Sequence, residues 1–453
     1  MTAKSLPVPN VLKKTLSESV AALDPVSEAI IARWCRAQWR KIGPTEIVLA
    51  YLSVMLASSA SFSRLARHVG CEVLDTVSRQ AVHKRTNKDL VAYFNRLVNK
   101  ALLEGMEEVA SGRGIDTRLF SAFTQVLIED SSCVPLPEAL AGHFPGAANG
   151  RGERKAMLKV DAMLDVKHWV LRRLAVNPYS KNDQSQAGVA VESVDPGTLL
   201  IRDLGYFTCA SLLDVDAKGA FFLTRLKYGV GLCDTDGRAV RLEELLKEGH
   251  VLDRRFLMGK MRLPVRLVAI PLPREAADER RRKAAKDRDR RLNHSADYIH
   301  RLGWTILVTN VGQDVWTTAE VAVAYGYRWF VETLFKTWKS HFNLDGQPCR
   351  TKPASPYPRE PKHPHKAEAL VLASLLFTVL VQMPLMAHFM VTNQPGEGQP
   401  MVSMLQLARM IADHFVHATS AQLTFLAQSM PYFCKYDTRK RRNAAERFAE
   451  RVA

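Results

Sequence analysis

The hydrophobic period of the chain changes near residue 119, and this change constrains the fold more than any other feature. Before it, apolar residues recur at helical spacing; after it, apolar and polar residues alternate in short runs, which is typical of strands. We expect strands at 124–128, 156–164, 168–175, 198–201, 220–228, 265–270 and 304–309. One long helix is expected to follow, at 318–341. The pattern therefore predicts an α/β protein.

The chain is too long, at 453 residues, for one compact core. We expect a helical N-terminal domain at 1–118 and a C-terminal helical region with a basic tail at 393–453. The apolar run 369–391 is long enough to cross a bilayer. Polar residues and a proline interrupt it, and no second run accompanies it, so a helix buried in a protein core is the better interpretation. We expect no membrane partner.

The charge balance points to a polyanionic partner. Lys and Arg number 63 against 46 Asp and Glu, a formal net charge of +17. Such an excess repels itself in a compact chain unless a polyanion is the usual partner, and nucleic acid is the leading candidate. A plain excess of surface lysine is the alternative. The seven cysteines are scattered and never spaced C-x-x-C, which argues against a disulfide framework and a zinc site. With no apolar secretion signal at the N-terminus, a cytoplasmic location is expected.

Two short helices in the N-terminal region suggest a DNA-binding motif. We expect them at 62–69 and 78–88, joined by a turn that contains Gly70. The second helix offers Arg79, Lys84 and Arg85 to solvent, as a basic recognition helix does. The connection is longer than the tight turn of a standard helix-turn-helix. A helical bundle with a solvated basic face fits the same residues.

The last long helix carries one carboxylate among cations. Within AYGYRWFVETLFKTWKS, Tyr325 is followed by Arg328, Glu332 and Lys339 at offsets of 3, 7 and 14. In a continuous helix these four project within an arc of about 60°, with Lys336 beside them. An ordinary solvated face with a Glu332–Lys336 pair fits this pattern. The chemical interpretation is that Glu332 binds a metal ion while the cations and the Tyr325 phenol hold a phosphate backbone.

The spacing Y-x2-R-x3-E-x6-K resembles the signature of DDE transposases of the insertion sequence four family, and this chain matches all four positions. The resemblance covers roughly residues 120–390. It implies a catalytic domain at 119–392 with a ribonuclease-H-like mixed sheet and a β-rich insertion at about 208–317. It also implies two aspartates, Asp130 after the first strand (QVLIEDSS) and Asp203 after the fourth (LLIRDLGYF).

Two features near these aspartates bear on their assignment. Glu129 stands next to Asp130, but alternation with Val126 and Ile128 and the family pattern both favour Asp130. Leu204 stands where many relatives carry Arg.

The expected catalytic and metal-binding residues are therefore Asp130, Asp203 and Glu332. Carboxylate oxygens are natural ligands for Mg²⁺ or Mn²⁺. The resemblance implies two such ions, which activate the nucleophile and stabilise the leaving 3′-oxygen. Hairpin-forming relatives stack a flipped base on a tryptophan near the end of the insertion, and Trp304 falls at the comparable place. Packing in the strand core is the alternative role for Trp304.

The function implied is that of an insertion-sequence transposase. It would cut DNA at terminal inverted repeats and join the ends to target DNA, as a homodimer in a bacterial cytoplasm, associated with the nucleoid when bound to DNA. A related nuclease without strand transfer is one alternative. A non-catalytic DNA-binding protein derived from a transposase is another, although the presence of all three acidic residues disfavours it.

Overall fold

The computed structural model divides the chain into two compact units. Unit 1 comprises Met1–Ile115, Ser131–Ser180 and Phe330–Asp437, and unit 2 comprises Asp116–Asp130, Lys181–Trp329 and Thr438–Ala453. The residues that the structure describes are 16–23, 42–55, 60–110, 118–148, 152, 154–180, 183–286, 294–344, 364–392, 403–414, 422, 425, 429, 433 and 434. The apolar pattern at 26–39 also predicts a helix, and this segment and the basic C-terminal tail lie outside these residues.

Unit 2 is built on a mixed sheet that begins with parallel strands. β1 (Val126–Leu136), of which the residues up to Asp130 belong to this unit, pairs in parallel with β5 (Leu199–Arg202), and β5 pairs in parallel with β6 (Phe221–Arg225). The strands beyond β6 are antiparallel and follow the order β11 (Trp304–Thr309), β10 (Leu263–Pro271), β9 (Leu252–Met258), β7 (Leu232–Cys233) and β8 (Ala239–Val240). β5 and β11 are buried along their whole length, as their mainly apolar sequences predict.

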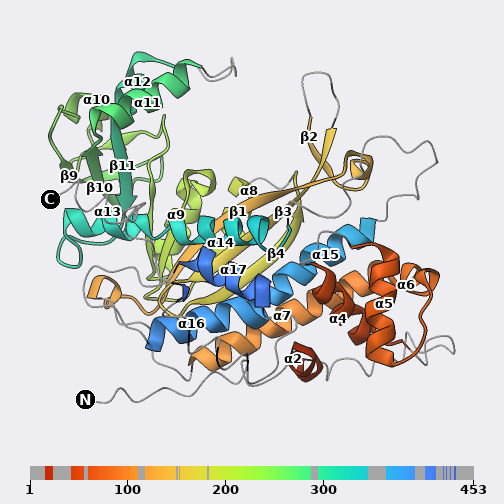
Figure 1. Cartoon of the computed structure of the whole chain (residues 1–453). Coiled ribbons are helices and arrows are strands. Elements are labelled where there is room, and N and C mark those ends of the chain that lie inside the picture. Colours follow the sequence, from red (N-terminus) through yellow and green to blue (C-terminus); the bar gives the residue numbers. More distant parts are fainter. Residues whose placement is uncertain are drawn as a thin grey trace, which may run out of the picture. The chain divides into compact units, whose positions relative to one another are not determined.

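Six α-helices and two 3₁₀ turns accompany this sheet among the described residues. They are η1 (Arg118–Phe120), α8 (Asp183–Glu192), η3 (Leu204–Tyr206), α9 (Cys209–Ala217), α10 (Leu242–Leu245), α11 (Arg274–Ala285), α12 (Ala296–Arg301) and α13 (Thr318–Gly326). Figure 1 shows α10, α11 and α12 gathered around one end of strands β9, β10 and β11. The ring of Trp316 packs edge-on against Phe120 and Phe123, which joins the start of α13 to the segment before β1.

Unit 1 combines a small antiparallel sheet with a group of helices. β3 (Arg154–Asp165) pairs with β4 (Val170–Pro178) and with β2 (Pro145–Ala148). Residues 131–136 of β1 belong to this unit, and β1 is next to β3 in the strand order. The helices are α2 (Leu16–Ala22), α4 (Pro44–Met55), α5 (Phe62–Val73), α6 (Arg79–Arg85), α7 (Lys88–Ala110), η2 (Glu138–Leu140), α14 (Trp329–Ser340), α15 (Pro364–Phe377), the π-helical turn η4 (Thr378–Gln382), α16 (Met383–Thr392) and α17 (Met404–His414).

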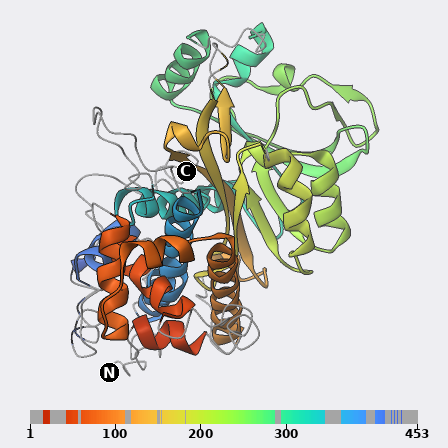
Figure 2. The same ribbon diagram turned by 90° about the vertical axis from the view of Figure 1, so that its right-hand side faces the viewer.

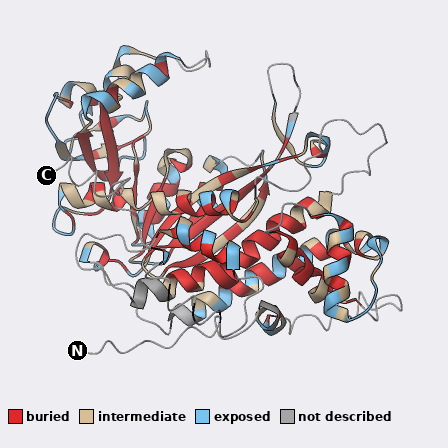
Figure 3. Cartoon of the chain, viewed as in Figure 1, coloured by how far each residue is buried: buried red, intermediate tan, exposed pale blue. Residues whose placement is uncertain are grey.

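The core of unit 1 forms around α15. This helix packs against α7 and α4, while α7 also packs against β4. Figure 2 shows α15 among the N-terminal helices, and Figure 3 shows that it is buried over most of its length. The stretch Pro364–Ala387 is long and apolar enough to span a membrane, but 94% of its most apolar window is buried inside the protein. The expectation of a buried core helix is therefore confirmed.

The fold class is confirmed: an open mixed sheet with helices before and after it, as expected of a ribonuclease-H-like core. The seven expected strands are all present with shifted ends. The structure also contains β2, β7, β8 and β9, which sequence periodicity did not predict.

The first strand is longer than predicted. It was expected to end at residue 128, with Asp130 in the turn after it, yet β1 continues to Leu136. Ser132, Val134 and Leu136 are buried in alternation, so the strand period persists through two serines that favour turns. Asp130 therefore lies inside β1 and not beyond its end.

The prediction of one continuous helix at 318–341 was wrong. The structure has α13 and α14, separated by a turn at Tyr327 and Arg328. The amides of these two residues donate to the carbonyl oxygens of Ala324 and Tyr325, three residues back, so the chain tightens into a 3₁₀ turn. Gly326, a poor helix former, stands where α13 ends.

Candidate active site

Two strands of unit 2 bring Asp130 and Asp203 together. The parallel pairing of β1 with β5 sets Glu129 opposite Arg202. The residue that follows each of them in the sequence is an aspartate, Asp130 or Asp203. Asp203 follows β5 in an extended conformation, at φ −76° and ψ 163°, and its carboxylate does not cap the short helix that begins after it. The two aspartates therefore lie at the same position along neighbouring strands.

Arg328 lies between these two carboxylates. Its Nη1 donates to Oδ2 of Asp130 at 3.5 Å, and its Nε lies 3.7 Å from Oδ1 of Asp203. The side chain of Asp203 is 37% exposed, whereas those of Asp130 and Arg328 are 18% and 19% exposed. Two carboxylates that converge on one cation form a strongly anionic position when that cation moves away.

The elements around α13 fix the position of Arg328. Thr317 begins α13 with a capping box, in which its hydroxyl accepts from the Glu320 amide while the Glu320 carboxylate accepts from the Thr317 amide. The ring of Tyr327 packs edge-on against Phe120 at 4.8 Å. These contacts hold the start of α13 and the turn that presents Arg328.

Tyr325 is buried beneath the Arg328 guanidinium. The guanidinium carbon lies 5.7 Å from the centre of the Tyr325 ring, and the tyrosine is 7% exposed. Burial, the largest cause, raises the pKa of Tyr325 to about 12, and nearby Asp203 acts in the same direction. The phenol therefore stays neutral and can only act as a hydrogen-bonding group near neutral pH.

The loop after Asp203 is shaped by a glycine. A Cβ on Gly205 would lie 2.9 Å from Oδ2 of Asp183, so no larger residue fits without movement of that carboxylate. Tyr206 and Phe207 then bury their rings, and Thr208 caps α9 through the amide of Ser211. These contacts hold the short segment that carries Asp203.

Glu332 lies in the first turn of α14 and belongs to unit 1. Within this helix the expected amphipathic pattern is present: Val331 and Leu334 are buried, Lys336 is exposed and Glu332 is half-buried. Lys339 is also half-buried.

The shared polar face expected for Tyr325, Arg328 and Glu332 does not exist as a face of one helix, because the chain turns after Gly326. Tyr325 in particular is buried instead of solvent-facing. Among the residues that the structure describes, no three His, Cys, Asp or Glu side chains form a group able to hold a metal ion. The structure thus brings together Asp130, Asp203, Arg328 and Tyr325, all within unit 2.

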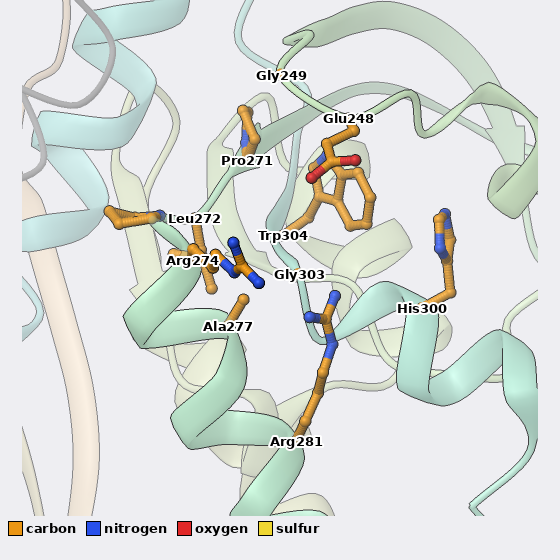
Figure 4. A pocket seen from close by; sticks show the side chains of 11 residues that line it. Glu248, Gly249, Pro271, Leu272, Arg274, Ala277, Arg281, His300, Gly303 and Trp304 are labelled. Atoms are coloured by element: carbon orange, nitrogen blue, oxygen red, sulfur yellow. The ribbon is translucent and has the colours of Figure 1, made fainter.

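Trp304 lines a pocket of about 650 Å³ in unit 2. Its side chain is 6% exposed and its ring centre lies 4.7 Å from that of His300. Among the described residues, its indole N–H has no hydrogen-bond partner. Figure 4 shows Trp304 with Arg281 and Arg274 around the cavity. The sequence identified Trp304, but not the pocket that it shares with Arg274 and Arg281.

The expected basic helix of the N-terminal region is α6 in unit 1. Ser78 caps it through the amide of Ala81, and Arg79 and Lys84 are exposed. Arg85 differs from the expectation because it is only partly exposed: its Nη1 donates to the carbonyl oxygen of Ala81, and burial lowers its pKa. Two of the three expected cations are therefore exposed.

Comparison with known proteins gives one family and several relatives. The family model described as "Transposase DDE domain" matches residues 121–355, more than half of the chain. The chain is 24% identical over 328 residues to the transposase for insertion sequence element IS231B of Bacillus thuringiensis subsp. berliner, an alignment that covers 67% of this chain and 68% of that protein. It is 23% identical over 316 residues to the transposase for insertion sequence element IS1151 of Clostridium perfringens, covering 63% and 64% of the two chains.

The chain thus spans about two thirds of the length of these relatives. A solved structure described as a piggyBac transposase synaptic complex with hairpin DNA aligns over 96% of this chain and 85% of that chain, at 7% identity and a TM-score of 0.40. That likeness is too weak to assign a fold by itself. The family match, in contrast, covers all three expected acidic residues.

Proposed function

The chain belongs to the DDE transposase family, and we propose that it is an insertion-sequence transposase that cuts the ends of its element and joins them to target DNA. As a transposase it is an enzyme that acts on DNA. The observation that carries the detailed proposal is the convergence of Asp130 and Asp203 on the Arg328 guanidinium. Two like-charged carboxylates held together around one cation mark a candidate functional site.

The residues present suit divalent metal ions. Asp130 and Asp203 supply hard oxygen ligands that already converge on a positive charge. We propose that Glu332, from the first turn of α14, completes the set. When bound, two Mg²⁺ or Mn²⁺ ions supply an activated nucleophile and stabilise the leaving 3′-oxygen.

The remaining residues of the proposed site hold DNA. Arg328 compensates the two aspartates in this structure, and once they hold metal its planar fork is free to bind a phosphate. Lys336 and Lys339 lie four and seven residues after Glu332 on the same helix and are proposed to bind the same backbone. The ring of Tyr325, a neutral phenol, packs against the Arg328 guanidinium and supports it.

Trp304 is proposed to receive a base. Its pocket offers an aromatic wall, an indole N–H without a partner among the described residues, and two arginines at the rim. A base stacked on an aromatic ring with phosphates near arginine is the usual arrangement for unpaired nucleotides. On α6, Arg79 and Lys84, with Arg85 partly exposed, are proposed to bind DNA phosphates.

The finer assignments rest on the sequence pattern. We propose membership of the insertion sequence four family from the Tyr-Arg-Glu-Lys spacing. We also propose that a homodimer pairs two element ends through their terminal inverted repeats, in the bacterial cytoplasm where that DNA lies.

The test is cleavage of end DNA by the full chain with Mg²⁺. We expect Asp130→Asn, Asp203→Asn and Glu332→Gln each to lower the cleavage rate at least a hundredfold while DNA binding persists, because each removes a metal ligand and no DNA contact. Glu275→Gln, an exposed carboxylate on α11, is the matched control and should cleave normally. Adding a supercoiled target separates a transposase, which joins the ends, from a nuclease, which only cuts. Normal cleavage by Glu332→Gln would exclude Glu332 from the site.

A further inference from the structure

A buried ion pair directly precedes the two aspartates of unit 2. Glu129 precedes Asp130 in β1, and Arg202 precedes Asp203 at the end of β5. Glu129 and Arg202 are register partners in the parallel pairing, and Nε of Arg202 lies 2.8 Å from Oε2 of Glu129. Their side chains are 1% and 2% exposed, so salt screens this interaction very little.

The pair and the aspartates occupy opposite faces of the sheet. Successive side chains of a strand alternate between faces, so Glu129 points away from Asp130. Asp203 remains extended after β5, which gives the same alternation between Arg202 and Asp203. The ion pair is therefore in the protein interior, while the aspartates are on the face that reaches solvent.

Arg202 is also tied to the elements around Asp203. Its Nη2 donates to the carbonyl oxygen of Ala187 in α8 at 2.8 Å. Its guanidinium carbon lies 5.8 Å from the ring centre of Tyr206, in the short helix that follows Asp203. One side chain thus connects β1, α8 and the segment that holds the second aspartate.

Stability alone does not explain such a pair. The cost of removing two charges from water largely offsets their attraction, and apolar residues of similar size often fill the same space as well or better. The pair instead makes one alignment of the strands favourable. A shift of β5 by one residue would leave both charges buried without each other, and it would move Asp203 away from Asp130.

We propose that Glu129 and Arg202 are positioning residues whose ion pair holds β1 and β5 in the register that sets Asp130 beside Asp203 for divalent metal binding. The inference rests on the proposed function, because metal binding is what requires the two carboxylates to lie side by side. Neither residue touches DNA or metal in this role. Each acts through the residue that follows it in the sequence, Asp130 or Asp203.

The test measures Mn²⁺ binding to the full chain by calorimetry, without DNA. We expect the double variant Glu129→Leu/Arg202→Met to bind Mn²⁺ at least tenfold more weakly, as loss of a group that orients metal ligands commonly does. Cleavage of end DNA should show a lower kcat with an unchanged KM for DNA, because DNA contacts are intact. Arg202→Lys keeps the charge opposite Glu129 and should recover most of the Mn²⁺ affinity.

A second ion pair of unit 2 provides the matched control. Arg301 of α12 contacts Glu243 of α10, and each side chain is 13% exposed. The double variant Glu243→Leu/Arg301→Met removes an ion pair from helices that carry no aspartate of the site. It should bind Mn²⁺ as the wild type does.

Several outcomes would overturn the proposal. Wild-type Mn²⁺ affinity and kcat in Glu129→Leu/Arg202→Met would show that the pair does not position the aspartates. Equal weakening in the Glu243→Leu/Arg301→Met control would show a general structural effect, and failure of the first double variant to fold would show that the pair serves folding itself. If the wild type neither binds Mn²⁺ nor cleaves end DNA, the proposed function fails, and the positioning role fails with it.

Discussion

Arg328 takes the place of a positive charge that the two aspartates require. Asp130 and Asp203 carry like charges at the same level of the sheet, and their repulsion opposes folding unless a cation lies between them. A guanidinium at 3.5 and 3.7 Å relieves that repulsion. In the proposed site, metal ions and Arg328 are alternative partners for the same carboxylates.

Replacement of Arg328 by Gln tests this competition. The metal-free variant should lose about 1 kcal/mol of stability, a modest value because all three side chains are partly exposed. Mn²⁺ should then raise its melting temperature more than that of the wild type, since the ions no longer displace an arginine. Thermal unfolding with and without Mn²⁺ measures both effects. An equal or smaller Mn²⁺ shift in Arg328→Gln would show that the arginine does not compete.

Burial of Tyr325 predicts a loss of stability in alkali. Its pKa rises from 10.0 to about 12, first because of burial, so the folded state binds the phenolic proton more tightly than the unfolded state does. A raised folded pKa gives stability that is complete below pH 10 and lost as the pH rises through 12. The contribution is about 3 kcal/mol. Denaturant unfolding of wild type and Tyr325→Phe from pH 9 to 12 should show a steeper decline for the wild type; parallel curves would contradict the assignment.

The start of β5 depends on a close approach of three chain segments. The Gly197 amide donates to the carbonyl oxygen of Gly219, before β6, and its own carbonyl accepts from the amide of Thr124, before β1. Gly197 has φ +78°, and a Cβ there would lie 3.0 Å from Cγ2 of Thr124. Glycine therefore fits this junction for two reasons, conformation and space.

Gly197→Ala should destabilise the protein by about 2 kcal/mol, of which about half is backbone strain at positive φ and half the contact with Thr124. Gly229→Ala separates the two causes: φ is +82° there, but nothing lies within 4 Å of an added Cβ. That control should lose only about 1 kcal/mol. Urea unfolding of both variants measures the difference, and equal losses would mean that Thr124 yields to the methyl group.

Elements with a strong hydrophobic periodicity could be predicted from the sequence, whereas most of their ends could not. The strand at Trp304–Thr309 was predicted at its observed limits because its aromatic and β-branched residues favour a strand and no turn former interrupts them. The length of β1 was missed because Ser131 and Ser132 favour turns, although Ser132 is buried in the strand.

Tertiary contacts decided what the sequence left open at the candidate site. The break before Arg328 was missed because both flanking segments have helical character, while the packing of Tyr327 on Phe120 is a contact far apart in sequence. The sequence identified Asp130 and Asp203, but the role of Glu129 as partner of Arg202 depends on strand register, which a single sequence does not specify.

The net charge of the whole chain, +17, sets how it approaches DNA. Each cation that neutralises a phosphate releases counterions, so the logarithm of affinity falls linearly with the logarithm of salt concentration, by about 0.9 for each phosphate contacted. A charge that is merely present on the surface changes the slope little. The slope therefore separates cations that touch DNA from those that only contribute to the total.

Lys336→Gln should reduce this slope by about 1 and weaken binding to all DNA sequences alike, because a lysine on a phosphate positions the duplex without reading its bases. Lys100→Gln removes the same charge from α7, where the ammonium already lies 3.7 Å from Glu104, and should leave the slope unchanged. Fluorescence anisotropy with end DNA at several salt concentrations gives both values. Equal changes in the two variants would mean that the chain attracts DNA through its overall charge and that Lys336 has no phosphate of its own.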